Sequence, residues 1–163
     1  MLNLRKHPER RGFYLLEAEQ FLPRGIDEVF SFFADAANLQ KLTPSIIDFQ
    51  ILTPLPITMR AGALIDYRLR LHGFPLKWRT EISDWEPPLR FMDRQLKGPY
   101  RVWEHEHRFV SQDGGTLVCD RVLYAVPGGA LIHHFFVKRD VRQIFEYRQK
   151  VLQELFPPVN NKI

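Results

Sequence analysis

The sequence has little cysteine, no long apolar run and none of the local motifs that mark common enzyme classes. Its single cysteine, Cys119, excludes an intrachain disulfide and a four-cysteine zinc site. No run of about 18 apolar residues is present, so we expect no membrane-spanning helix. Residues 1–11 are rich in charge and lack the apolar segment of a signal peptide, which predicts a cytoplasmic protein. A glycine-rich phosphate loop, a nucleophile elbow and a zinc-protease helix motif are all absent.

Composition and length indicate one globular domain. The chain has 163 residues, of which 45% are hydrophobic and 26% charged. Its 13 Phe, 5 Tyr and 3 Trp can build a core or line a pocket. The net charge is only +4, and the basic residues are dispersed along the chain. We therefore expect no nucleic-acid partner and at most peripheral contact with membranes.

The first third of the chain predicts one strand followed by two short helices. Residues 13–22 alternate as a strand and end at a Pro-x-Gly sequence. Residues 27–33 and 36–42 have short helical patterns, and the second ends at a Thr-Pro pair. Residues 45–52 then return to an extended pattern.

A period of two dominates the middle of the chain. Residues 65–71 alternate apolar and charged side chains, which is typical of a strand with one face in water. Four more predicted strands follow at 76–85, 90–96, 100–110 and 116–126. Short turns separate them, including Asp-Gly-Gly before the last strand, so an antiparallel meander is expected.

The end of the chain predicts a long amphipathic helix over residues 130–156. Its apolar stripe has one interruption, Arg148, and a Pro-Pro pair ends the helix. Such a helix can bury its stripe only against the apolar face of the sheet. The predicted fold class is α+β: a curved antiparallel sheet of about seven strands wraps around this helix. The single domain spans 13–157, between a charged N-terminal tail (1–12) and a C-terminal tail (158–163). One helix cannot fill the wide end of such a sheet, so we expect a cavity there.

Several segments resemble one known superfamily. They are 22–33, Asn38-Leu39 with Leu42-Thr43-Pro44, 91–95 with Gly98-Pro99-Tyr100, 103–109 and 120–129. In this order they resemble the START-like (SRPBCC, helix-grip) superfamily over residues 13–156. That superfamily includes polyketide cyclases/dehydrases, pollen-allergen-type lipid binders and coenzyme Q-binding proteins. The resemblance implies a small hydrophobic or amphipathic ligand, such as a lipid, isoprenoid, quinone or polyketide-like aromatic, and no cofactor.

Alternation places a polar cluster inside the predicted cavity. In the segment 103–109, the charged residues at 104, 106 and 108 belong in water, so His105 and His107 face inward. The same reasoning applied to the neighbouring strands completes the cluster. The predicted inward polar residues are Asp93, Gln95, His105, His107, Asp120 and Tyr124.

Three interpretations of this cluster remain open. It could be a satisfied structural network, a set of groups that orients the polar head of a ligand, or an acid–base pair. In the last case His105 or His107 would be tuned by Asp93 or Asp120. A His-x-His pair can also bind zinc, but no third ligand has motif spacing, so we expect no metal.

The sequence therefore predicts a ligand-binding protein. Its expected ligand-binding residues are Tyr67, Leu69, Trp78, Phe91, Asp93, Gln95, Trp103, His105, His107, Tyr124 and Phe136. The residues from His133 to Phe136 are expected to pack at the cavity mouth. One alternative is a cyclase or dehydratase that uses the His/Asp cluster. Another is a regulatory module that contacts a protein partner through Lys138, Arg139 and Arg142.

Overall fold

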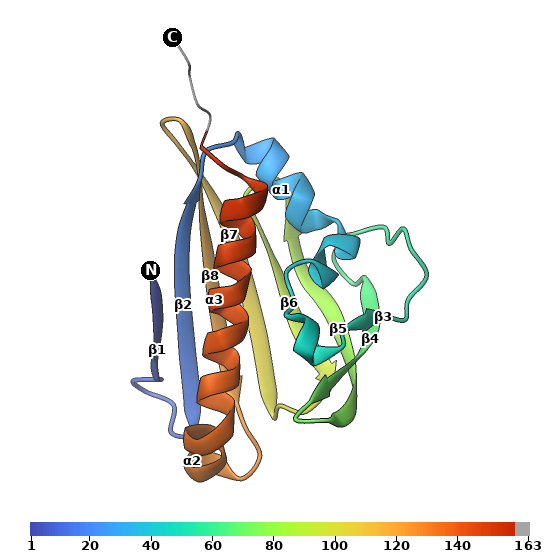
Figure 1. Cartoon of the computed structure of the whole chain (residues 1–163), viewed down its shortest axis with the longest axis vertical. Helices are drawn as coiled ribbons and strands as arrows, with labels where there is room; N and C mark the ends of the chain where they lie inside the picture. Colours follow the sequence, from blue (N-terminus) through green and yellow to red (C-terminus); the bar gives the residue numbers. More distant parts are fainter. Residues whose placement is uncertain (159–163) are drawn as a thin grey trace.

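An eight-stranded antiparallel sheet and a long C-terminal helix make up most of the computed structural model, which describes residues 1–158 (Figure 1). The strands are β1 (Leu2–Lys6), β2 (Phe13–Leu22), β3 (Gln50–Ile51), β4 (Leu64–Leu71), β5 (Phe74–Glu86), β6 (Arg90–Lys97), β7 (Val102–Gln112) and β8 (Gly115–Ala125). Their order is β1-β2-β8-β7-β6-β5-β4-β3. The last six strands thus form the predicted meander, and β2 pairs with the last of them.

The helix that crosses the sheet is continuous from α2 (Gly129–Ile132) through a π-helical turn (His133–Val137) to α3 (Lys138–Leu155). Four residues of α3 are buried, at steps of three and four: Val141, Phe145, Arg148 and Leu152. This spacing places one side of the helix against the sheet. The α+β helix-grip fold is confirmed.

The short helices lie where the sequence predicted them, with one change of type. α1 (Ile26–Ala34) buries Val29, Phe30 and Phe33, because apolar side chains recur on one side. A 3₁₀ helix, η1 (Ala36–Gln40), follows, and the Asp35 carboxylate caps it by accepting a hydrogen bond from the Ala37 amide at 2.9 Å.

The extended segment predicted at 45–52 is mostly not a strand. It contains a 3₁₀ turn, η2 (Ser45–Ile47), and only the two residues of β3 pair with β4. Asp48 lies between them in the left-handed conformation, with φ 47°, and ends the 3₁₀ turn.

The N-terminal segment differs from the predicted tail. Residues 2–6 form β1, which pairs with β2 in the register Leu2↔Ala18 to Lys6↔Tyr14. Leu2 and Leu4 pack against the core, and the outward Arg5 pairs with Glu17 at 3.0 Å. The sequence analysis treated these residues as a tail because of their charges and did not use their short alternation. With β1 included, the sheet has eight strands instead of about seven. The predicted C-terminal tail, 158–163, lies outside the described residues apart from Pro158.

His133 fastens the start of the long helix to the sheet. Its ring is 5% exposed, stacks on Tyr14 with 3.3 Å between ring centroids, and lies 2.9 Å from the Tyr124 hydroxyl through Nε2. The residue therefore packs on β2 and β8 and does not line the cavity, contrary to the expected place at its mouth. Burial, assisted by the nearby charge of Lys138, lowers the pKa of His133 to about 4.

We predict that His133 makes the fold sensitive to acid. An unfolded histidine titrates near 6.5, so the unfolded chain binds a proton that folded His133 refuses between about pH 6.5 and 4. Above this window the free energy of unfolding should carry no penalty from His133. Within the window it should fall as the pH falls, and at pH 5 this residue should account for a loss of about 1–2 kcal/mol. Urea unfolding at pH 7 and pH 5 measures the loss, which H133Q should reduce. The exposed neighbour variant H134Q is the control, and an equal effect of both variants would contradict the account.

Candidate functional site

A cavity of about 190 Å³ lies between the concave face of the sheet, the short helices and α3. An apolar cavity of about 150 Å³ can hold benzene, so this one has room for a small organic molecule. Its lining is mainly aromatic and aliphatic. The predicted residues that line it are Tyr67, Leu69, Trp78, Phe91, Asp93, Trp103, His105 and His107. Binding of a ligand by these residues remains a prediction.

Three of the predicted ligand-binding residues lie elsewhere. The Gln95 amide closes the turn between β6 and β7: its Nε2 donates to the Tyr100 carbonyl at 2.7 Å, and its Oε1 accepts from the Tyr100 amide at 3.2 Å. Tyr124 is fully buried behind the cavity, on His133. Phe136 is 52% exposed and does not line the cavity; its ring lies edge-on to His72, with 6.1 Å between ring centroids. Alternation gave the correct face for the two strand residues but could not show how far along the strand the cavity extends.

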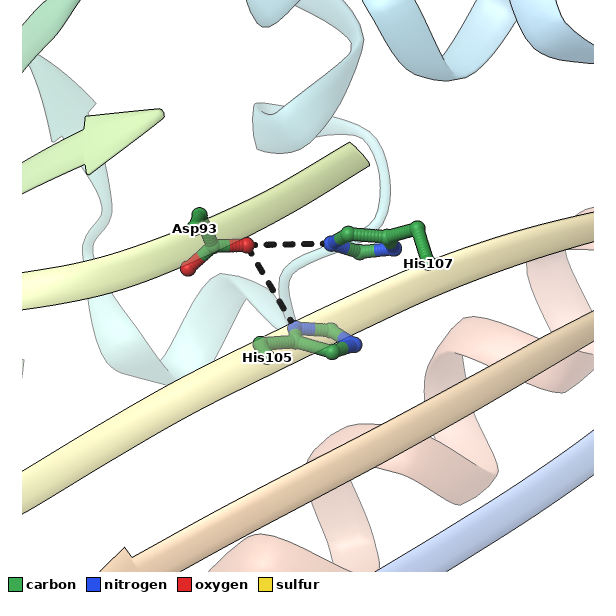
Figure 2. Close-up of side chains that lie close together, drawn as sticks. All are labelled: Asp93, His105 and His107. Atoms are coloured by element: carbon green, nitrogen blue, oxygen red, sulfur yellow. Dashed lines mark hydrogen bonds and ion pairs between the residues drawn. The ribbon is translucent and has the colours of Figure 1, made fainter. Parts of the chain in front are cut away.

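His105 and His107 lie next to each other on β7, with 3.8 Å between their ring centroids. Strand register brings a carboxylate to each side of the pair, because Asp93 of β6 faces His105 and Asp120 of β8 faces His107. Asp120 Oδ1 lies 2.9 Å from both His105 Nε2 and His107 Nδ1. Figure 2 shows Asp93 on the other side, where its Oδ2 is 3.0 Å from His107 Nε2 and 3.7 Å from His105 Nδ1.

Arg148 completes this cluster from the helix, and the sequence analysis did not include it. The side chain is buried, and its Nη2 lies 3.2 Å from Asp120 Oδ1 and 3.2 Å from His107 Nδ1. Its guanidinium carbon is 5.0 Å from the centre of the Phe33 ring. The sequence did indicate Arg148, because this residue is the one interruption of the apolar stripe of the helix. A charge on a buried helix face requires a partner of opposite charge, and Asp120 is that partner.

The cluster has an asymmetric charge distribution. Burial alone would raise the pKa of Asp120, but the Arg148 charge and the two histidine hydrogen bonds hold it well below its usual range. Burial also opposes a charge on His107, yet its hydrogen bonds to Asp120 and Asp93 outweigh burial and raise its pKa. Burial and the neighbouring His107 lower the pKa of His105. The surroundings therefore favour the protonated form of His107 and the neutral form of His105.

This arrangement limits the chemistry that the cluster can perform. Both nitrogens of His107 face carboxylate oxygens, so neither is free for a cavity ligand as long as Asp93 keeps its contact. His105 Nδ1 has only the 3.7 Å contact with Asp93 and is the freest nitrogen of the pair. Acid–base work on a cavity ligand would thus fall to His105 and Asp93. These two residues and His107 are also the described residues whose donor atoms lie close enough together to share a metal ion.

Comparison with known families assigns the chain to one of them. Residues 22–147 match the family model described as "Polyketide cyclase / dehydrase and lipid transport". This match covers most of the sequence, so the chain belongs to that family. No curated protein sequence matches it.

Solved structures share the fold at low sequence identity. The protein CV1439 from Chromobacterium violaceum has a TM-score of 0.70 at 12% identity, covering 88% of this chain and 97% of that one. The Zhui aromatase/cyclase from Streptomyces sp. R1128 has a TM-score of 0.67 at 14% identity, with coverage of 88% and 93%. The structure of Ara h 8.0201 has a TM-score of 0.64 at 15% identity, with coverage of 89% and 98%. Within residues 1–158, no helix combines the length and apolar character needed to cross a membrane.

We predict that Arg148 is required for stability because of Asp120. The variant R148M keeps the length and apolar body of the side chain but leaves the Asp120 carboxylate buried without its cation. Loss of one partner of a buried pair costs about 3–5 kcal/mol in the free energy of unfolding, measurable by urea denaturation. Adding D120N to R148M should recover part of this loss, because the amide carries no charge.

The control is R142M, which removes an arginine at the surface of the same helix. Arg142 lies 3.7 Å from Glu146, and both side chains are exposed. An exposed pair of this kind contributes about 1 kcal/mol or less. Equal losses for R148M and R142M would show that the buried pair does not hold helix and sheet together.

Proposed function

We propose that this protein binds a small hydrophobic or amphipathic molecule in the cavity between the sheet and α3. The observation that supports this function best is the cavity itself, whose wall is mainly aromatic and aliphatic. A well-packed domain interior has few voids larger than a water molecule, and an apolar void of this size gives up packing contacts. A ligand with an apolar body would restore those contacts.

The lining supports a ligand with one polar end. Tyr67 and Trp78 stack at 5.8 Å between ring centroids, and Trp103 contacts Trp78 edge-on, which makes an aromatic wall. Asp93 of β6 and the two histidines make the polar part of the same lining. The indole Nε1 of Trp78 is buried without a hydrogen-bond partner within the described chain. A carbonyl or hydroxyl oxygen on the ligand would satisfy such a donor.

The comparisons agree with this class of ligand. The matched family is described by polyketide cyclisation and dehydration and by lipid transport, all of which involve molecules with apolar bodies. A lipid, an isoprenoid, a quinone and a polyketide-like aromatic share the chemistry that the lining accepts. Uptake of such a molecule requires no reaction, and binding is therefore the function that we assign.

Filling the cavity should abolish this binding. Leu69 of β4 is buried and lines the cavity, so L69W would place an indole in the space for the ligand. The probe is 1-anilinonaphthalene-8-sulfonate, an aromatic molecule with one polar end. We expect one saturable site by fluorescence titration in the unmodified protein, and at least about tenfold weaker binding in L69W.

The matched control is L64W, the same substitution on the same strand. Leu64 is 46% exposed and does not line the cavity. L64W should bind the probe as the unmodified protein does, and circular dichroism confirms that both variants are folded. Equal probe binding by folded L69W and L64W would place the probe outside the cavity and contradict the proposal.

A further inference from the structure

Three donor atoms of different strands meet at the cavity wall. They are Asp93 Oδ2 from β6 and His105 Nδ1 and His107 Nε2 from β7, and all lie within 4.8 Å of one another. Figure 2 shows the carboxylate directed at both rings. All three residues also line the cavity, so the group is adjacent to the proposed ligand space.

Two of the three distances between these donor atoms are close to those of a metal centre. Zinc bonds of about 2.0–2.1 Å in a tetrahedral arrangement place neighbouring donor atoms about 3.3–3.4 Å apart. The contacts of Asp93 Oδ2 with His107 Nε2 and His105 Nδ1, at 3.0 and 3.7 Å, lie on either side of this value. The two histidine nitrogens lie within 4.8 Å of each other, so the rings would move together to enclose an ion.

The remaining nitrogen of each histidine has the partner that metal-bound histidines require. His105 Nε2 and His107 Nδ1 both lie 2.9 Å from Asp120 Oδ1, and Arg148 in turn contacts the same oxygen at 3.2 Å. A carboxylate that accepts from the far nitrogen fixes the ring orientation and makes the near nitrogen a better ligand. Here the carboxylate does this for His105, while His107 Nδ1 lies near both this carboxylate and the buried Arg148, whose Nη2 is 3.2 Å away.

We propose that Asp93, His105 and His107 form a binding site for a divalent transition-metal ion, with zinc as the ion that fits the donor set. Two imidazoles and one carboxylate leave a fourth position, which faces the cavity. The ion would replace the hydrogen bond between His107 and Asp93. Zinc binding is independent of the proposed ligand function.

The site could not be found from motif spacing. His105 and His107 are two residues apart, which alone is a weak signal, and the third donor lies 12 positions before His105 in the sequence. The antiparallel register Asp93↔His105 brings that donor next to the pair. A sequence search for a third ligand near the histidines misses it, and for that reason the sequence analysis expected no metal.

The test uses the full chain after treatment with a chelator. Calorimetric titration with Zn²⁺ should show one equivalent bound, and Co²⁺ should give the intense visible absorption of a four- or five-coordinate site. D93N, which is nearly isosteric and changes only the half-buried member of the site, should weaken Zn²⁺ binding at least about tenfold. D120N removes the charge of the orienting carboxylate and of the partner of Arg148; where circular dichroism shows that this variant is folded, it should weaken Zn²⁺ binding about 10–100-fold.

The control is H72N, because His72 and Asp140 form another histidine–carboxylate contact, at 2.8 Å and on the surface. Asparagine tolerates the positive φ of 51° at that position. H72N should bind Zn²⁺ unchanged. No binding, loss of binding in H72N, or full binding in D93N would overturn the proposal. So would the weak Co²⁺ absorption of a six-coordinate aqueous-type site.

A second measurement needs no variant, so it does not depend on whether the variants fold. Nitrogen-detected NMR of the unmodified protein should show Zn²⁺ shifting the ring signals of two histidines, His105 and His107, while those of His7 and His134 stay in place. Shifts at the surface histidines alone would overturn the proposal. The 1-anilinonaphthalene-8-sulfonate titration of the chelator-treated protein separates the ligand proposal from the zinc proposal. Probe binding in the cavity without zinc supports the proposed function, whether or not zinc binds.

Discussion

The buried contact between Asp120 on β8 and Arg148 on α3 is the interaction on which the rest of the structure depends. It joins the sheet to the helix that crosses it, at the place where an apolar stripe would otherwise be continuous. Because both charges are buried, neither can lose the other without a large cost in free energy. Asp120 also accepts from His105 and His107, so the same contact that docks the helix fixes the two rings. Fold and site are thus held by one network.

Much of the fold could be predicted because its signals are local. The alternation of residues 65–71 and 103–109 defines strand faces, and the stripe of Val141, Phe145 and Leu152 defines the buried side of the helix. β1 was missed because five residues with two charges resemble a tail, although it pairs with β2 across a connection of only six residues, 7–12. The inward cluster was predicted from the same alternation. Alternation cannot show whether an inward side chain reaches the cavity. It placed Tyr124 on the correct face, but only the packing of His133 shows that the Tyr124 hydroxyl is buried behind the cavity.

The polar cluster joins a buried structural network to the wall of the cavity. Its inner part, Asp120 with Arg148, is buried and internally paired, as expected of groups that give the core one arrangement. Its outer part, Asp93 with the near nitrogens of the histidines, belongs to the cavity wall. Of the three interpretations that the sequence left open, the structural network therefore applies to the inner part of the cluster, and ligand recognition or acid–base chemistry could concern only its outer part. The inner residues hold the two rings in place, and the outer ones are those that the proposals assign to a ligand or an ion.

The central claim is that a small apolar molecule is held inside the domain, and its position can be measured directly. Intermolecular NOEs between bound 1-anilinonaphthalene-8-sulfonate and the protein report which side chains lie against the probe. The account predicts contacts with the indole protons of Trp78 and Trp103, which line the cavity. The competing sites are the exposed aromatic rings of Phe74, Phe135 and Phe136. NOEs to these outer rings, with none to the two indoles, would contradict the claim.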